Sequence, residues 1–288
     1  MLREASTRGE TGSGIICDML TRLAVPVAAV VALLAGCTLN AGSAFAEQYS
    51  AYLNSVPEVA EHQVRGNNDA PAHGSADSTV TLVAGLDPTR VANVVTELAN
   101  HRVDQSVGEH RLTVRFWTPN GAGEQVLGSV SWSIQDDTGA LVVSDVAAQV
   151  RRAVDFLAAD AELTDLTTGV GVARVTTTGD PFETAERASI LAADATTEFF
   201  QITVSTDVGH VSVFAGDPVD ALRPLDEVLD AVPDGVEVTR WRATSQNATR
   251  EPLFEIALAA GTGDDVVRVI ESAARGAGIT VEVTVAVG

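Results

Sequence analysis

The sequence predicts an α+β protein made of two ferredoxin-like (βαββαβ) sandwich modules in tandem, joined by an extra helix and strand. Short runs such as Ile279–Val287 alternate apolar and polar residues, which is typical of half-buried strands. Other segments, such as Pro88–His101, place apolar residues at the i, i+3, i+4 spacing of an amphipathic helix. The order β-α-β-β-α-β occurs twice in 288 residues that are 45% hydrophobic, so the chain can bury a core for both modules.

The first module covers residues 78–179. Its strands are predicted at Thr79–Ala84, His110–Trp117, Glu124–Gln135 and Gly169–Thr177. Its helices are predicted at Pro88–His101 and from Ser144, a suitable N-cap residue, to about Leu157.

Residues 180–206 supply the connecting helix, about Phe182–Ala195, and the strand Phe200–Ser205. The second module covers residues 207–288, with strands predicted at Val211–Ala215, Val236–Ala243, Leu253–Ala259 and Ile279–Val287, and helices at residues 218–232 and Asp264–Ala277. Pro224 lies inside the first of these helices, so we expect the main helix to begin near it.

Three Asp-Pro pairs precede predicted helices: Asp87-Pro88, Asp180-Pro181 and Asp217-Pro218. Asp accepts hydrogen bonds from free backbone amides at an N-cap, and Pro presets φ at the first helical position. We therefore interpret these aspartates as helix starts and not as catalytic groups.

The composition excludes several classes of protein. All 18 basic residues are Arg, and without Lys there can be no Walker A loop, Schiff-base lysine, Ser–Lys dyad or protein-kinase site. The formal net charge of −21 argues against a nucleic-acid partner, because phosphates are repelled. The two cysteines, Cys17 and Cys37, both lie in the N-terminal leader, so neither a disulfide framework nor a cysteine-based metal site is expected.

The leader, residues 1–36, carries an uncharged apolar stretch at 23–36, preceded by Arg22. Fourteen residues are too few for a membrane span but fit the core of a signal peptide. The stretch ends in Leu34-Ala35-Gly36-Cys37, which resembles the lipobox of bacterial lipoproteins. The resemblance implies that Cys37 is acylated and becomes the first mature residue, so that the protein is anchored to the outer face of the cytoplasmic membrane. Residues 37–77 are then expected to form a flexible tether, with a short helix around Phe45–Leu53.

Two alternatives to the lipobox stay open. Ala44-Phe45-Ala46 is an A-x-A pattern, which would allow secretory cleavage before Glu47. The apolar stretch could also persist as an uncleaved signal anchor. Met19 would itself make a normal signal-peptide start, so the true start of the chain is left open as well.

The candidate surface-binding residues are aromatic side chains beside arginines. Strand alternation places Arg115 and Trp117 on the sheet face away from the helices, and Arg240, Trp241 and Arg242 occupy the corresponding strand of the second module. One interpretation is a stacking platform for an envelope glycan or protein. The other, which we favour from the sequence, is that the two open faces pack together and bury both tryptophans.

The sequence shows no convergent catalytic, metal or cofactor set. HExxH and GxSxG motifs are absent. His101, Asp104, Glu109 and His110 could gather at one loop, and Asp160, Glu162 and Asp165 form the densest acidic loop, but solvated loop residues explain both sets. We therefore expect no catalytic residues, no metal and no cofactor.

The stretch Phe199–Ala243 resembles a BON domain, a small envelope module, in its strand–turn–strand–helix pattern and in Gly209, Gly216 and Gly235-Val236-Glu237-Val238. No residue role follows from this resemblance. Together these observations predict a lipid-anchored envelope protein that binds or scaffolds. The alternative from another class is an envelope-polymer hydrolase that uses an acidic pair.

Overall fold

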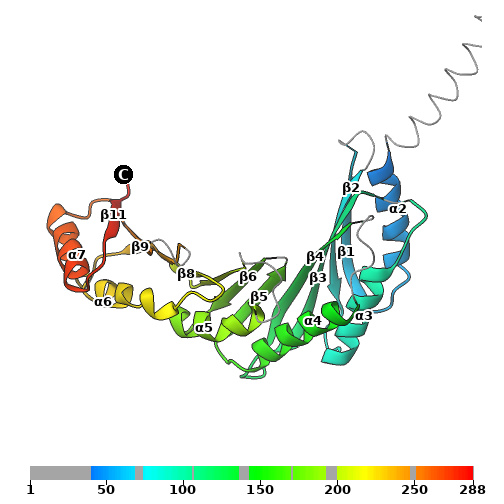
Figure 1. The fold of residues 1–288 in the computed structure, drawn as a ribbon, viewed down its shortest axis with the longest axis horizontal. Coiled ribbons are helices and arrows are strands. Elements are labelled where there is room, and N and C mark those ends of the chain that lie inside the picture. The colour runs from blue at the N-terminus through cyan, green and yellow to red at the C-terminus, as the bar shows by residue number, and fades with distance from the viewer. Residues whose placement is uncertain are drawn as a thin grey trace, which may run out of the picture.

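The computed structural model describes residues 40–68, 74–105, 107–135, 143–169, 171–192, 200–246 and 251–287. They form one curved β-sheet with helices along its convex face (Figure 1). Within these ranges no helix is long and apolar enough to cross a membrane.

The sheet contains eleven strands that lie side by side in the order of the sequence. They are β1 Val59–Asn67, β2 Ser75–Leu82, β3 Glu109–Pro119, β4 Gln125–Gln135, β5 Leu163–Gly169, β6 Val172–Thr177, β7 Gln201–Ser205, β8 Gly209–Phe214, β9 Val238–Thr244, β10 Leu253–Leu258 and β11 Val281–Val285. Antiparallel and parallel pairs alternate, from β1 with β2 (antiparallel) to β10 with β11 (parallel).

Each parallel pair is bridged by a helical crossover, and each antiparallel pair after β2 is a hairpin, so one βαβ unit repeats along the sheet. The α-helices are α2 Ala41–Leu53, α3 Pro88–Asn100, α4 Val143–Ala158, α5 Pro181–Ala188, α6 Pro224–Asp230 and α7 Asp264–Gly276. Short 3-10 turns η2 Ser189–Ala192 and η3 Val219–Ala221 accompany α5 and α6.

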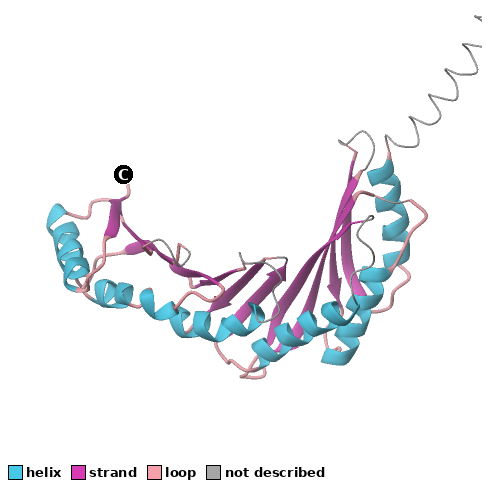
Figure 2. Ribbon diagram, viewed as in Figure 1, coloured by secondary structure: helices cyan, strands magenta, loops and turns pink. Residues whose placement is uncertain are grey.

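The core lies between the sheet and the helices. Alternate strand residues point toward the helices, as in β3, where Leu112, Val114 and Phe116 are fully buried. The helices meet them with apolar stripes, for example Val91, Val94 and Leu98 of α3. The opposite face of the sheet is concave, and no helix of the described ranges lies on it (Figure 2).

The prediction of an α+β fold is confirmed, whereas two separate ferredoxin-like sandwiches are not found. In a split βαβ unit another strand lies between the two parallel strands that the helix connects. Here the connected strands are direct neighbours, as β2 and β3 show, and a single sheet runs through both predicted modules and the connecting segment.

The stretch predicted as a flexible tether is largely ordered. Its short helix is α2, and β1, which we did not predict, joins the sheet beside β2. Tyr49 and Leu53 of α2 are fully buried, and the Tyr49 hydroxyl donates to the carbonyl of Leu98 at 2.9 Å. The helix α2 is therefore part of the folded body, because its apolar side covers the core at the β1 end of the sheet.

Two of the three Asp-Pro pairs act as predicted. The side chain of Asp87 accepts from the amides of Thr89 and Arg90, and that of Asp180 accepts from Phe182 and Glu183. The prediction is wrong for Asp217. No side-chain cap forms at η3, and its Oδ2 atom is buried without a partner in the described chain. Pro224 begins α6, as expected for a proline at the first helical position.

Candidate functional site

The concave face of the sheet carries a row of hydroxyl groups. Register links Thr79 of β2 to Thr113 of β3 and to Ser131 of β4. Ser129 lies two residues from Ser131 on the same face of β4, and its pairing with Thr167 of β5 continues the row to the later strands. We call this row the hydroxyl stripe; its members are Thr79, Thr113, Ser131, Ser129, Thr167, Thr203, Ser212 and Thr244.

Hydrogen bonds across neighbouring strands order the stripe. The hydroxyls of Thr113 and Ser131 are 2.8 Å apart, the Ser129 hydroxyl donates to Thr167 at 2.8 Å, and those of Thr203 and Ser212 are 3.0 Å apart. Ser129, Ser212 and Thr244 are buried, whereas the other five members of the stripe are half-buried and partly accessible.

Arginines stand along the stripe. Across the strands that the stripe crosses, β2 to β9, the concave face carries five of them against three carboxylates, in a chain whose net charge is −21; the arginines are Arg111, Arg115, Arg174, Arg240 and Arg242, and the carboxylates are Asp77, Glu109 and Asp165. Arg174 interrupts the stripe between Thr167 and Thr203. The concave face is therefore locally basic on an acidic protein.

The arginines differ in how they are held. Arg111 donates to Glu109 at 2.9 Å, and Arg242 donates to Thr244 at 2.9 Å with Glu255 3.9 Å away. Arg115 and Arg174 form no ion pair with any residue that the structure describes, so their guanidinium groups are available to a ligand.

His210 and Asp165 also lie on this face. Burial lowers the pKa of His210, and the neighbouring Arg242 and Arg240 lower it further, whereas Glu255 opposes this shift. Burial raises the pKa of Asp165, and the nearby Arg115 opposes that rise.

The structure places four of the five predicted surface residues on the concave face. Arg115, Arg240 and Arg242 point there, and Trp117 is 37% exposed beside Leu127 of β4. The sequence-based prediction that the two open faces pack on each other is wrong, because both predicted modules share one sheet.

Trp241 does not belong to this surface. It is 7% exposed and stacks on Phe182 of α5, on the helix side. The register of β9 against β10 shifts by one residue between Ala257 and Leu258, so Thr239 is an extra residue in β9. This β-bulge reverses the alternation between Val238 and Trp241, and simple two-residue periodicity could not reveal it.

The candidate metal residues are not brought together. His110 is buried, with its Nε2 2.8 Å from the Ser78 hydroxyl, whereas Glu109 lies on the opposite face of the same strand. His101 stacks on Tyr52 with ring centroids 3.3 Å apart. Among the residues that the structure describes, no three His, Cys, Asp or Glu side chains cluster as metal ligands.

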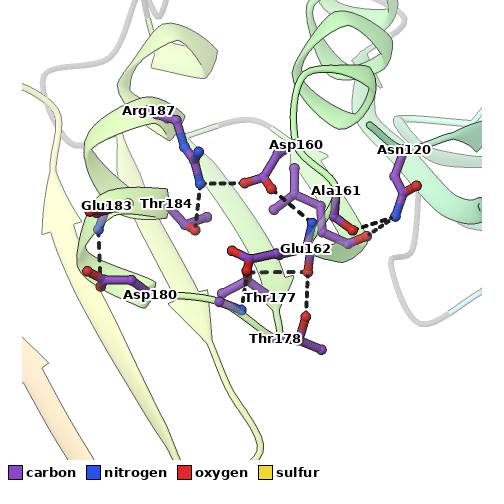
Figure 3. A network of polar contacts seen from close by, with 12 residues as sticks. Asn120, Asp160, Ala161, Glu162, Thr177, Thr178, Asp180, Glu183, Thr184 and Arg187 are labelled. Atoms are coloured by element: carbon purple, nitrogen blue, oxygen red, sulfur yellow. Dashed lines mark hydrogen bonds and ion pairs between the residues drawn. The ribbon is translucent and has the colours of Figure 1, made fainter. Parts of the chain in front are cut away.

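The densest acidic loop, which contains Asp160 and Glu162 and precedes β5, holds neighbouring elements together (Figure 3). Asp160 forms an ion pair with Arg187 of α5 and accepts from the amide of Glu162 at 2.9 Å. Asn120, from the turn between β3 and β4, donates to the carbonyls of Ala161 and Leu163 at 2.9 and 3.2 Å. These contacts hold the β3–β4 turn and α5 against the start of β5, and they engage the carboxylate of Asp160 within the protein.

A second acidic group surrounds Arg223, between α5 and α6. Its guanidinium lies 3.2 Å from Asp220, 3.6 Å from Glu186 and 3.7 Å from Asp180. Burial, followed by the nearby charge of Asp180, raises the pKa of Asp226 to about 6.

The predicted lipobox, Leu34, Ala35, Gly36 and Cys37, lies outside the described residues. Comparison of the chain with protein-family models, with curated proteins and with solved structures finds no match.

Proposed function

We propose that this chain is a binding module held at the outer face of the cytoplasmic membrane, and that its concave face binds an extended acidic glycan of the cell envelope. The observation that carries the proposal is the hydroxyl stripe flanked by arginines on a sheet face that no described helix covers.

Charge supports an anionic ligand. Arg115 and Arg174 have no ion-pair partner among the described residues, and five arginines outnumber three carboxylates from β2 to β9. Guanidinium groups bind carboxylates through paired hydrogen bonds, which gives both attraction and orientation.

The remaining chemistry of the face supports a glycan. Hydroxyl groups can donate to and accept from sugar hydroxyls, and Trp117 offers an aromatic surface for a sugar ring. The stripe crosses the sheet from β2 to β9, about 34 Å at ~4.8 Å per strand spacing, which suits an extended polymer better than a small molecule.

The position of α2 supports anchoring through Cys37. Cleavage before Glu47 would remove the first half of α2, including the buried Phe45, whose ring lies 4.7 Å from that of His110. Cleavage before Cys37 leaves α2 whole, with three residues between the lipidated cysteine and the helix. The folded body would then sit within about 15 Å of the bilayer surface.

The binding test uses the full chain in mild detergent, with polygalacturonate as the acidic glycan and dextran as the neutral one. We expect binding to polygalacturonate alone, weakening as salt is raised. The Arg115→Ala/Arg174→Ala variant should bind at least tenfold more weakly, and Trp117→Ala should also weaken binding. Arg151→Ala, on the exposed side of α4, removes charge from the helical face and is the matched control. Equal binding of dextran, or an equal loss with Arg151→Ala, would refute the proposal.

The anchor is tested separately by the Cys37→Ala variant, which should lose lipid labelling and leave the membrane fraction. A chain that stays in the membrane with its leader attached, by intact mass, would show the uncleaved signal anchor instead.

One observation favours the hydrolase as a second candidate. Asp226, whose pKa is raised to about 6, could donate a proton beside the nearby carboxyl group of Asp180. The hydrolase predicts release of reducing ends from polygalacturonate, lost in Asp226→Asn. Binding without release of reducing ends would exclude this activity on that polymer.

A further inference from the structure

The last strand of the array, β11, has a free edge. It pairs with β10 on one side, and no strand of the described chain lies on the other side. Unpaired amide and carbonyl groups along such an edge are a template for another strand.

The core is also open at this end. Val281, Val283 and Val285 face the helix side but are only half-buried. The corresponding Val211 and Val213 of β8, inside the array, are 0% and 3% exposed. At the other end of the sheet α2 covers the core, whereas no described element follows β11.

The sequence of β11, Val-Glu-Val-Thr-Val, has the same apolar–polar pattern in both directions. Antiparallel pairing with an identical strand, centred on Val283, places Val281 opposite Val285 and Glu282 opposite Thr284. Valines then meet valines on the helix side, and no carboxylate stands directly opposite another on the concave side. The β10–β11 pair is parallel, so an antiparallel partner also continues the alternation of the sheet.

We infer that β11 is the docking edge for a second copy of this chain, which adds its own β11 by two-fold antiparallel pairing. The two sheets become one, and the half-buried valines become buried as in the interior strands. Two-fold pairing closes after two copies, whereas pairing of β11 with the β1 edge of another copy would extend into filaments.

The test exploits the exposed side chains of β11, Glu282 and Thr284, which can be changed without touching the core. Thr284→Glu places its new carboxylate opposite Glu282 of the other copy, once on each side of the two-fold axis. The double variant Glu282→Lys/Thr284→Glu places Lys opposite Glu instead. Glu237→Lys/Thr239→Glu makes the same changes at the start of β9, which β10 separates from β11, and is the control away from the edge.

The mass of the full chain in mild detergent, from light scattering during size exclusion, should be that of a dimer at micromolar concentration. We expect Thr284→Glu to weaken the dimer about tenfold, and the double variant to restore it. A monomer throughout, a dimer unaffected by Thr284→Glu, failure of the double variant to restore it, or growth into filaments would each overturn the inference.

Discussion

The indole of Trp241 in β9 stacks on the ring of Phe182 in α5, with centroids 6.0 Å apart and planes 8° from parallel. Directly opposite Trp241 in the sheet is Gly209 of β8, and a Cβ atom there would overlap the indole. The absence of a side chain at Gly209 is thus what lets the Trp lie flat between sheet and helix.

Gly209→Ala should therefore destabilise the protein by about 2–3 kcal/mol, since the indole must leave its place against Phe182. Urea unfolding followed by tryptophan fluorescence measures this change. Gly276→Ala, in α7, has open space around its new methyl group and should stabilise by about 0.5–1 kcal/mol. Equal effects of the two substitutions would contradict the close contact.

Asp226→Asn should raise the melting temperature at pH 7.5 and change it little at pH 4. Burial raises the pKa of Asp226 to about 6, above its ordinary value in the unfolded chain, so the folded state binds the proton more tightly. Stability from this group is present at low pH and is lost as pH rises toward 6. Thermal melts of both proteins across this range provide the measurement. A gain that is larger at pH 4 than at pH 7.5 would contradict the assignment.

His110 should make the fold sensitive to acid. Burial lowers its pKa to about 4, and Arg102 contributes, so between pH 6.5 and 4 the unfolded chain binds a proton that the folded chain does not. Stability is then lost as pH falls through this window, by up to about 3 kcal/mol. His110→Gln, which can still bond Ser78, should flatten this part of the pH profile of urea unfolding. An unchanged slope would show that another group titrates.

Arg187→Ala should destabilise by about 2 kcal/mol, because it removes the ion-pair partner of the buried carboxylate of Asp160. Asp160→Ala should also destabilise, since the amide of Glu162 loses its acceptor. A double-mutant cycle in urea should return a coupling energy of about 1–2 kcal/mol. Arg151→Ala, on the exposed side of α4, should change stability by less than about 0.5 kcal/mol, and a coupling near zero would show that the pair is not formed.

Periodicity predicted most strands and helices of this fold, because an element with one buried face must repeat its apolar residues. It missed β1, an edge strand with few apolar residues, and it missed β5, because the strand predicted at Gly169–Thr177 covers β6 and only the last residue of β5; the φ of +72° at Gly171 marks the turn between the two strands.

The sequence by itself determined most of the elements, two of the helix caps and the alternation that puts Arg115 and Trp117 on one face of β3. Only the tertiary structure decided that all strands join one sheet, and that the Thr239 bulge turns Trp241 toward the helices. The physical reason is that periodicity reports which face of an element is buried, whereas strand partners and register depend on residues far apart in the chain.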